Sequence, residues 1–92
     1  MIQSFKDAEA EKIFGRHRSR RFAGIEERIL RKLLAIHAAA QLDELTIPPG
    51  NRLEALKGSR KGQYSIRVND QFRICFRWKE SDAHEVEIVD YH

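Results

Sequence analysis

The chain has little of what stabilises small secreted domains or holds structural metals. Its single cysteine is Cys75, and only two prolines and five glycines occur among 92 residues. One cysteine excludes an internal disulfide and a cysteine-rich zinc site, and it suits a reducing compartment. No Cys–His pairing is visible, so we interpret Cys75 as a small, half-buried strand residue rather than as a nucleophile.

Long apolar runs are also missing. The N-terminal segment MIQSFKDAEAEK is acidic and lacks an apolar core of signal-peptide length, and no stretch approaches the ~20 apolar residues of a membrane span. There is no internal repeat, low-complexity tract or linker, so residues 1–92 are predicted to form one domain. We expect a cytoplasmic protein with no membrane partner.

Charge is unevenly distributed, although the net charge is only +3. Residues 12–32 and residues 52–79 each carry eight Lys or Arg against two acids, whereas residues 80–92 carry five acids and no Lys or Arg. Two basic zones suit a polyanionic partner such as nucleic acid. Ordinary solvated surface charge is the alternative interpretation of the same pattern.

The first part of the chain is predicted to be an arm followed by a helix. Residues 1–5 have the character of an edge strand or extended arm. A short amphipathic helix is expected over residues 7–14, with Asp7 as its N-cap and Gly15 at its end. The arginine-rich segment 16–22 is predicted to be a loop.

The clearest helical pattern covers residues 24–42. Its apolar positions recur at steps of three and four residues and are Ile25, Ile29, Leu30, Leu33, Leu34, Ile36 and Leu42. This stripe predicts a core-facing helix with His37 on its flank. The segment TIPPG, residues 46–50, cannot continue a helix and ends the pattern.

From residue 51 the apolar period changes to two. Strands are expected over residues 63–68, 72–78 and 84–91, with a short strand over 51–56 and a basic turn over 57–62. Helices followed by an antiparallel meander predict an α+β domain. In this fold class, N-terminal helices pack on one face of a small antiparallel β-sheet.

The register of the first hairpin follows from burial. A three-residue loop over 69–71 gives one apolar face, made of Tyr64, Ile66, Val68, Phe72, Ile74, Phe76 and Trp78. A slip by one residue would turn every apolar side chain to the wrong side. The same register sets Arg67 directly opposite Arg73 on the other, open face, where like charges destabilise a strand pair.

The second hairpin is predicted to pair Trp78 with His84. This pairing sets Arg77 opposite Glu85, Cys75 opposite Glu87 and Arg73 opposite Val89. One end of the open face then holds a compensated cluster of charges, while the end with Arg67, Arg73 and Tyr91 lacks an anion.

Two interpretations of the facing arginines remain open. Both side chains can spread into solvent, where repulsion is screened over ~8 to 10 Å. Alternatively, the two guanidinium groups grip a phosphate. The chain ends with Asp90, Tyr91 and His92, whose acid, phenol and imidazole groups can move protons near neutral pH. Neighbouring strand residues alternate between faces, so these three reach one substrate only if the tail curls after residue 90.

Two segments resemble one known family. PPGNRLEALKGSRKGQYSIRVNDQFRICFRW, residues 48–78, and the closing VEIVDYH resemble the HigB branch of the RelE/ParE toxin superfamily, also called plasmid maintenance system killer proteins. The resemblance spans nearly the whole chain. It implies the RelE-like microbial ribonuclease fold and a toxin of a type II toxin–antitoxin system.

The activity that the resemblance implies is cleavage of messenger RNA in the ribosomal A site, which inhibits translation. Such toxins use no metal or other cofactor, because the RNA 2′-hydroxyl attacks the neighbouring phosphate. The residues that match the family's catalytic positions are Lys57, Arg67, Arg73, Asp90, Tyr91 and His92. Arg52, Arg60 and Lys61 are expected to hold RNA without reading its sequence. Glu54 matches a position where some relatives keep a general base, and its role stays open.

The implied partners are the messenger, the ribosome and a HigA-like helix-turn-helix antitoxin, with operator DNA contacted only through the antitoxin complex. Two alternative functions remain. A ParE-like DNA gyrase poison would act through protein contacts, and the matching Arg73 and DYH argue against it. A non-catalytic RNA-binding or ribosome-binding module would depend on charge but not on His92.

Overall fold

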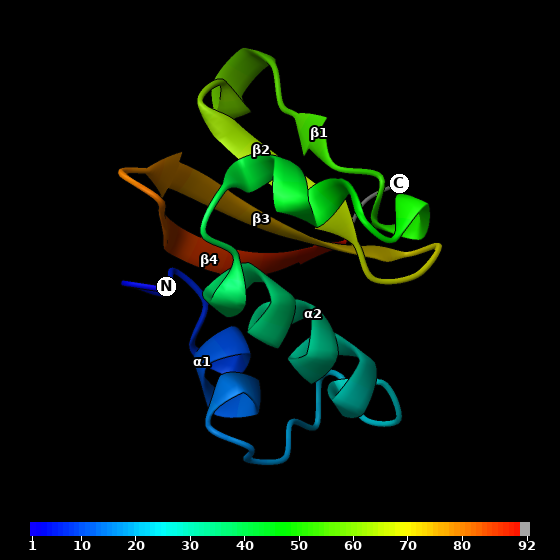
Figure 1. The fold of residues 1–92 in the computed structure, drawn as a ribbon. Helices are drawn as coiled ribbons and strands as arrows, with labels where there is room; N and C mark the ends of the chain where they lie inside the picture. Colours follow the sequence, from blue (N-terminus) through cyan, green and yellow to red (C-terminus); the bar gives the residue numbers. More distant parts are fainter. Residues whose placement is uncertain (91–92) are drawn as a thin grey trace.

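Two helices and a four-stranded antiparallel sheet make up residues 1–90, which the structure, a computed structural model, describes. The helices are α1 (Ala8–Phe14) and α2 (Glu26–Ala38). The strands, in their order in the sheet, are β1 (Glu54–Ala55), β2 (Gln63–Arg67), β3 (Phe72–Lys79) and β4 (Asp82–Asp90). Three short 3-10 turns are η1 (Leu42–Thr46), η2 (Pro49–Asn51) and η3 (Gly58–Arg60). Figure 1 shows α1 and α2 on one side of the sheet, which confirms the predicted α+β architecture.

α1 and the arm before it lie as predicted. Asp7 is the N-cap of α1 and accepts a hydrogen bond from the backbone N–H of Glu9 at 2.8 Å. The preceding arm runs parallel to β4, where Ile2 bridges to Ala83. The imidazole Nδ1 of His37 accepts a hydrogen bond from the Ile2 backbone at 3.1 Å. His37 therefore ties α2 to the arm.

α2 is shorter than predicted, because it ends at Ala38 and not at residue 42. The Glu44 carboxylate accepts hydrogen bonds from the backbone N–H groups of Ala40 and Gln41, at 3.0 and 2.7 Å. These contacts belong to the capping box at the start of η1 (Leu42–Thr46), so the chain turns from α2 into η1 with these backbone donors paired. The core-facing positions of α2 are Ile29, Leu33 and Ile36. Within residues 1–90, no helix is both long enough and apolar enough to span a bilayer.

The register of β2 and β3 is the predicted one. Ile66 pairs with Ile74, and Arg67 pairs with Arg73. The helix-facing side of these strands carries the predicted apolar face, of which Ile66, Val68, Ile74 and Phe76 are buried and Tyr64, Phe72 and Trp78 are half-buried.

The predicted register of the second hairpin was wrong near its turn. Trp78 pairs with Ala83, not with His84, although Cys75 faces Glu87 as predicted. The turn has two residues, both with positive φ, as a tight hairpin turn requires. A bulge then restores the alternation: two residues of β4 face one of β3, and Glu85 adopts a φ of 52°. The bulge lets both Ala83 and the apolar residues that follow it point into the core.

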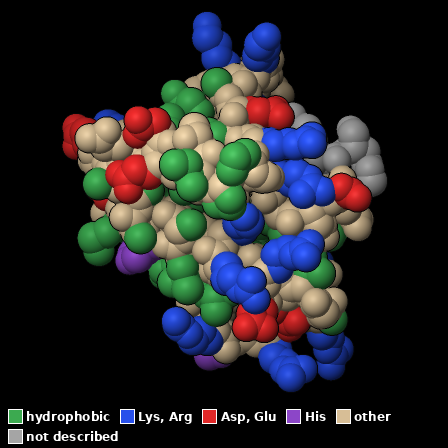
Figure 2. All heavy atoms as spheres, turned by 45° about the vertical axis from the view of Figure 1, so that its right-hand side comes forward, with side chains coloured by type: hydrophobic (Ala, Val, Ile, Leu, Met, Phe, Trp, Pro, Cys, Tyr) green, Lys and Arg blue, Asp and Glu red, His purple; other side chains and the backbone are tan. Residues whose placement is uncertain are grey.

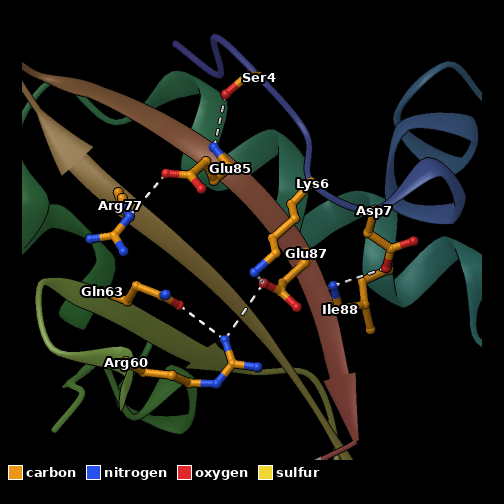
Figure 3. Close-up of polar contacts among 9 residues, drawn as sticks. All are labelled: Ser4, Lys6, Asp7, Arg60, Gln63, Arg77, Glu85, Glu87 and Ile88. Carbon is orange, nitrogen blue, oxygen red and sulfur yellow. Dashed lines mark hydrogen bonds and ion pairs between the residues drawn. The ribbon is translucent and has the colours of Figure 1, made fainter. Parts of the chain in front are cut away.

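We had predicted that the second face of the sheet is open, and this prediction was wrong. Ser65, Arg73 and Cys75 all project from it and are buried. Figure 3 shows Lys6 and Arg60 reaching the carboxylate of Glu87 on this side, at 3.4 and 3.5 Å. The predicted ion pair between Arg77 and Glu85 is present at 2.9 Å. A layer of polar and charged side chains therefore covers part of this face.

Asp7 links α1 to the sheet, since its second oxygen accepts a hydrogen bond from the Ile88 backbone at 3.2 Å (Figure 3). Asp7→Ala removes the helix cap and leaves a strand N–H without its acceptor, so we expect a loss of about 1 to 3 kcal/mol in the free energy of unfolding. Urea denaturation measures this loss. Asp7→Asn keeps an oxygen for the cap and should lose less. An unchanged midpoint for Asp7→Ala would contradict the assignment.

Candidate active site at the Arg67 and Arg73 end of the sheet

The guanidinium of Arg73 is held inside the protein by hydrogen bonds. Arg73 is 7% exposed. Its Nε donates to the hydroxyl of Ser65 at 2.8 Å, and one terminal nitrogen donates to the backbone carbonyls of Arg52 at 2.5 Å and of Ser65 at 3.3 Å. A charge at this depth is tolerated only when its donors are satisfied. The acceptors therefore determine how the guanidinium is oriented.

A carboxylate from β1 stands beside this guanidinium. Glu54 pairs with Ser65 in the sheet, and its Oε1 lies 3.7 Å from a terminal nitrogen of Arg73. The Glu54 side chain is 50% exposed. Glu54 thus approaches Arg73 from the solvent side of the site.

Arg67 has a different carboxylate partner. Its guanidinium pairs with Asp70, which lies in the turn between β2 and β3 and whose side chain is 100% exposed. The prediction that this end of the sheet lacks an anion was therefore wrong. The prediction considered only side chains that face one another across β2, β3 and β4. Asp70 instead contacts Arg67 from three residues later in the chain, and Glu54 comes from β1.

The chain before β1 is shaped so that one carbonyl reaches Arg73. Arg52, which supplies this carbonyl, adopts a left-handed backbone with φ of 46°. The preceding Asn51 is buried, and its amide donates to the backbone carbonyls of Leu45 at 3.2 Å and Ile47 at 3.3 Å. The Asn51 side-chain oxygen accepts a hydrogen bond from Lys32 of α2. These contacts fix the loop that completes the site.

Sequence reasoning missed the residues that support Arg73. Ser65 lies among apolar neighbours in β2, and Asn51 follows a Pro-Pro-Gly turn, so neither belongs to a recognisable motif. The available signal was a polar residue at a position that alternation places on the same face as Arg73. Ser65 meets that criterion, whereas the role of Asn51 requires a contact with α2 that only the fold creates.

The predicted RNA-contacting cations lie in two environments. The side chains of Arg52, Lys57 and Lys61 are exposed, with Lys57 and Lys61 flanking η3. Arg60 instead donates to Gln63 Oε1 at 3.0 Å and pairs with Glu87 (Figure 3). The structure therefore gives Arg60 a role in covering the sheet, in addition to any contact with a ligand.

Asp90 is the last residue that the structure describes. It pairs with Phe72 and so has the helix-facing parity that alternation predicts, whereas Arg73 pairs with Val89 on the other side. Asp90 is exposed at the rim of the sheet, where the Gln71 amide donates to it at 3.1 Å. The predicted site residues Tyr91 and His92 lie outside the described residues.

Cys75 is fully buried next to this site, more deeply than predicted. Burial raises the pKa of its thiol, so the thiol stays protonated near neutral pH. Across residues 1–90, no group of three or more His, Cys, Asp or Glu side chains is placed to hold a metal ion.

The arrangement is suited to an oxyanion ligand. A guanidinium that is already oriented, a second arginine across the strand pair and a half-exposed carboxylate lie within one end of the sheet. Arginine forks match the oxygens of phosphate, and pre-oriented donors stabilise charge without reorganising.

Comparison with known proteins shows the family of the chain. Residues 3–92 match the family model described as RelE-like toxin of type II toxin-antitoxin system HigB. Toxin HigB-1 of Vibrio cholerae serotype O1 is 41% identical over 85 residues, which cover 90% of each chain. Endoribonuclease HigB of Proteus vulgaris is 38% identical over 66 residues, which cover 72% of this chain and 71% of the relative.

Two solved structures share the fold at low sequence identity. YafQ from Escherichia coli superposes with a TM-score of 0.63 at 12% identity, covering 98% of this chain and 93% of that one. A chain of the heterotetrameric YoeB-YefM toxin-antitoxin complex from Staphylococcus aureus superposes with a TM-score of 0.61 at 18% identity. The match covers 100% of this chain and 98% of that one.

Ser65→Ala tests the support of Arg73. The substitution removes the hydroxyl that accepts from a buried, charged Nε, so we expect a loss of about 1.5 to 3 kcal/mol in the free energy of unfolding. Chemical denaturation measures the loss, and Ser59→Ala, at an exposed position in η3, is the matched control. Equal stabilities of the two variants would show that Ser65 does not hold the guanidinium.

Proposed function

The chain belongs to the family of RelE-like toxins of the type II toxin-antitoxin system HigB, and we propose that it is a ribosome-dependent endoribonuclease that cleaves messenger RNA in the A site and so inhibits translation. As a toxin of such a system, it has an antitoxin as its partner. The name of the Proteus vulgaris relative, an endoribonuclease, supports this activity.

The observation that carries the proposal is the fixed guanidinium of Arg73. Attack on a phosphodiester builds negative charge on the phosphoryl oxygens, and pre-oriented donors stabilise that charge most effectively. Arg67 lies directly across the strand pair and adds a second positive charge. Glu54, 3.7 Å from Arg73, is the carboxylate with which an entering phosphate would compete.

The proposed reaction is an internal transesterification. A base removes the proton of the RNA 2′-hydroxyl while that oxygen attacks the neighbouring phosphorus. The bond from phosphorus to the 5′ oxygen breaks, and an acid protonates the leaving oxygen. The products are a 2′,3′-cyclic phosphate and a 5′-hydroxyl, so the step consumes no oxidant, metal ion or other cofactor.

We assign the proton transfers to the end of the chain. His92 or Asp90 acts as base or acid, and Tyr91 positions the base of the nucleotide that is cut. The exposed Lys57 adds positive charge near the phosphate. Support for these roles comes from the match of the closing DYH to the family pattern.

The remaining partners follow from the same proposal. Arg52, Arg60 and Lys61 hold messenger or ribosomal RNA through its phosphates. The antitoxin is a HigA-like helix-turn-helix protein, and operator DNA is bound only by the complex of the two. The toxin acts in the cytoplasm, because translating ribosomes and their messenger are found there.

Arg73→Ala tests the phosphate role. Loss of one pre-oriented donor should raise the barrier to cleavage by about 2 to 4 kcal/mol. The measurement adds purified protein to translating ribosomes that carry a defined message and maps new 5′ ends by primer extension. Arg77→Ala, which removes an arginine paired with Glu85 at the other end of the sheet, should cleave like the wild type. Antitoxin binding checks that each variant is folded. A wild-type rate for Arg73→Ala would remove this residue from the mechanism.

Deletion of His92 separates catalysis from binding. If His92 transfers a proton, the deletion should lower the cleavage rate by about 10² to 10⁴-fold while ribosome affinity changes little. Single-turnover cleavage and ribosome cosedimentation measure the two quantities. Equal losses in both, or a variant that still cleaves, would favour a non-catalytic ribosome-binding module.

A further inference from the structure

A cavity of about 430 Å³ lies between α2, the turn η2 and the end of β2. Four cationic side chains line it, Arg28, Arg31 and Lys32 from α2 and Arg67 from β2. Among the described residues that line this cavity, none is acidic. We call it the α2 basic cavity. Figure 2 shows many Lys and Arg side chains on this face of the molecule, with a few Asp and Glu side chains among them.

Three of these cations share one face of α2. Arg31 and Lys32 follow Arg28 by three and four residues, spacings that bring each of them beside Arg28 on the helix surface. Like charges at this spacing destabilise a helix by a few tenths of a kcal/mol per pair. Arg28 also lies in the first turn, where the helix dipole favours acids. Helix stability therefore does not explain this cluster.

The charges in the cavity act on one another. Burial lowers the pKa of the Lys32 ammonium, and the positive charges of Arg28 and Arg67 lower it further. The hydrogen-bond partner of Lys32 is the neutral amide of Asn51, not a carboxylate. Asp70, which pairs with Arg67, is fully exposed in the turn outside the cavity. An anion in the cavity would relieve repulsion that the chain itself leaves largely uncompensated.

The cavity is adjacent to the candidate active site. Arg67 lines the cavity and pairs across the strands with Arg73. The two arginines thus have different surroundings: Arg73 is held inward by Ser65, while Arg67 lines the cavity and pairs with the exposed Asp70. A nucleic acid strand with one phosphate beside Arg73 would meet this cavity if it ran along the side of Arg67.

We propose that the α2 basic cavity binds a phosphate of the RNA strand next to the one that is cleaved. The inference rests on the proposed function, because it takes the bound strand to be the substrate RNA. Guanidinium groups bind phosphate oxygens through paired hydrogen bonds, and such contacts need no particular base.

The lining favours RNA over an acidic segment of a protein. Protein partners anchor themselves through large apolar or aromatic side chains in desolvated pockets. The apolar lining of this cavity consists of Ala35, Pro48 and Val68, and Val68 is 4% exposed. Little apolar surface is thus available to seat such an anchor, whereas the cations are concentrated.

The experiment measures how salt weakens RNA binding. Fluorescence anisotropy follows a short, labelled, 2′-O-methylated RNA, which the toxin cannot cleave because the attacking hydroxyl is blocked. Arg28→Ala with Arg31→Ala should weaken binding and reduce the slope of log K against log salt by about 0.7, the contribution of one single-strand phosphate contact. Arg28→Lys with Arg31→Lys keeps the charge and should restore most of the slope.

Matched controls and cleavage assays separate the outcomes. Arg18→Ala with Arg20→Ala removes two exposed arginines from the loop between α1 and α2 and should leave the slope unchanged. On ribosomes, the Arg28 and Arg31 variant should keep its kcat and raise its KM several-fold. An unchanged slope, an equal effect of the control, or no binding of the RNA by wild type at the lowest salt overturns the proposal.

Failure of the cavity and failure of the proposed function are distinguishable. Wild-type cleavage together with an unchanged slope in the Arg28 and Arg31 variant rejects only the cavity. Absence of wild-type cleavage rejects the nuclease. If this variant binds the antitoxin more weakly and its RNA slope is unchanged, the cavity binds an acidic protein segment and not an RNA phosphate. That result overturns the proposal.

Discussion

Burial of the Arg73 guanidinium is the constraint on which the rest of the site depends. A charged group at 7% exposure requires acceptors on several sides, and in this protein they come from different parts of the chain. The Ser65 hydroxyl comes from the neighbouring strand, a carbonyl comes from Arg52, and the Glu54 carboxylate comes from β1. The segment that precedes β1 must therefore lie where it does for Arg73 to be tolerated.

That requirement links the site to the helices. The Arg52 carbonyl is presented by a left-handed backbone, and Asn51 anchors this turn to two earlier carbonyls and to Lys32 of α2. A packed helix thus helps to set the orientation of an arginine on the far face of the sheet. Since buried networks of this kind are costly when only partly satisfied, loss of one member should be felt by the others.

The two arginines that face each other are suited to different contacts with an anionic ligand. Arg73 is inside, oriented and shielded, which suits contact with developing negative charge. Arg67 lies at the end of β2, next to the exposed Asp70 and the cations of α2. This position suits contact with an RNA strand that enters from solvent. Their repulsion is tolerable because separate carboxylates stand beside each of them.

Local patterns in the sequence determined the fold class, the Asp7 cap, the register of β2 on β3 and hence the facing of Arg67 and Arg73, because alternation and capping depend on residues close together in the chain. Only the tertiary structure decided the bulge at Glu85, the shorter α2, the acids beside the two arginines and the α2 basic cavity. The contact of Glu54 with Arg73 and the α2 basic cavity arise where segments distant in sequence meet. The bulge, the end of α2 and the contact of Asp70 with Arg67 are local, and burial selects them among alternatives that alternation alone leaves nearly equal.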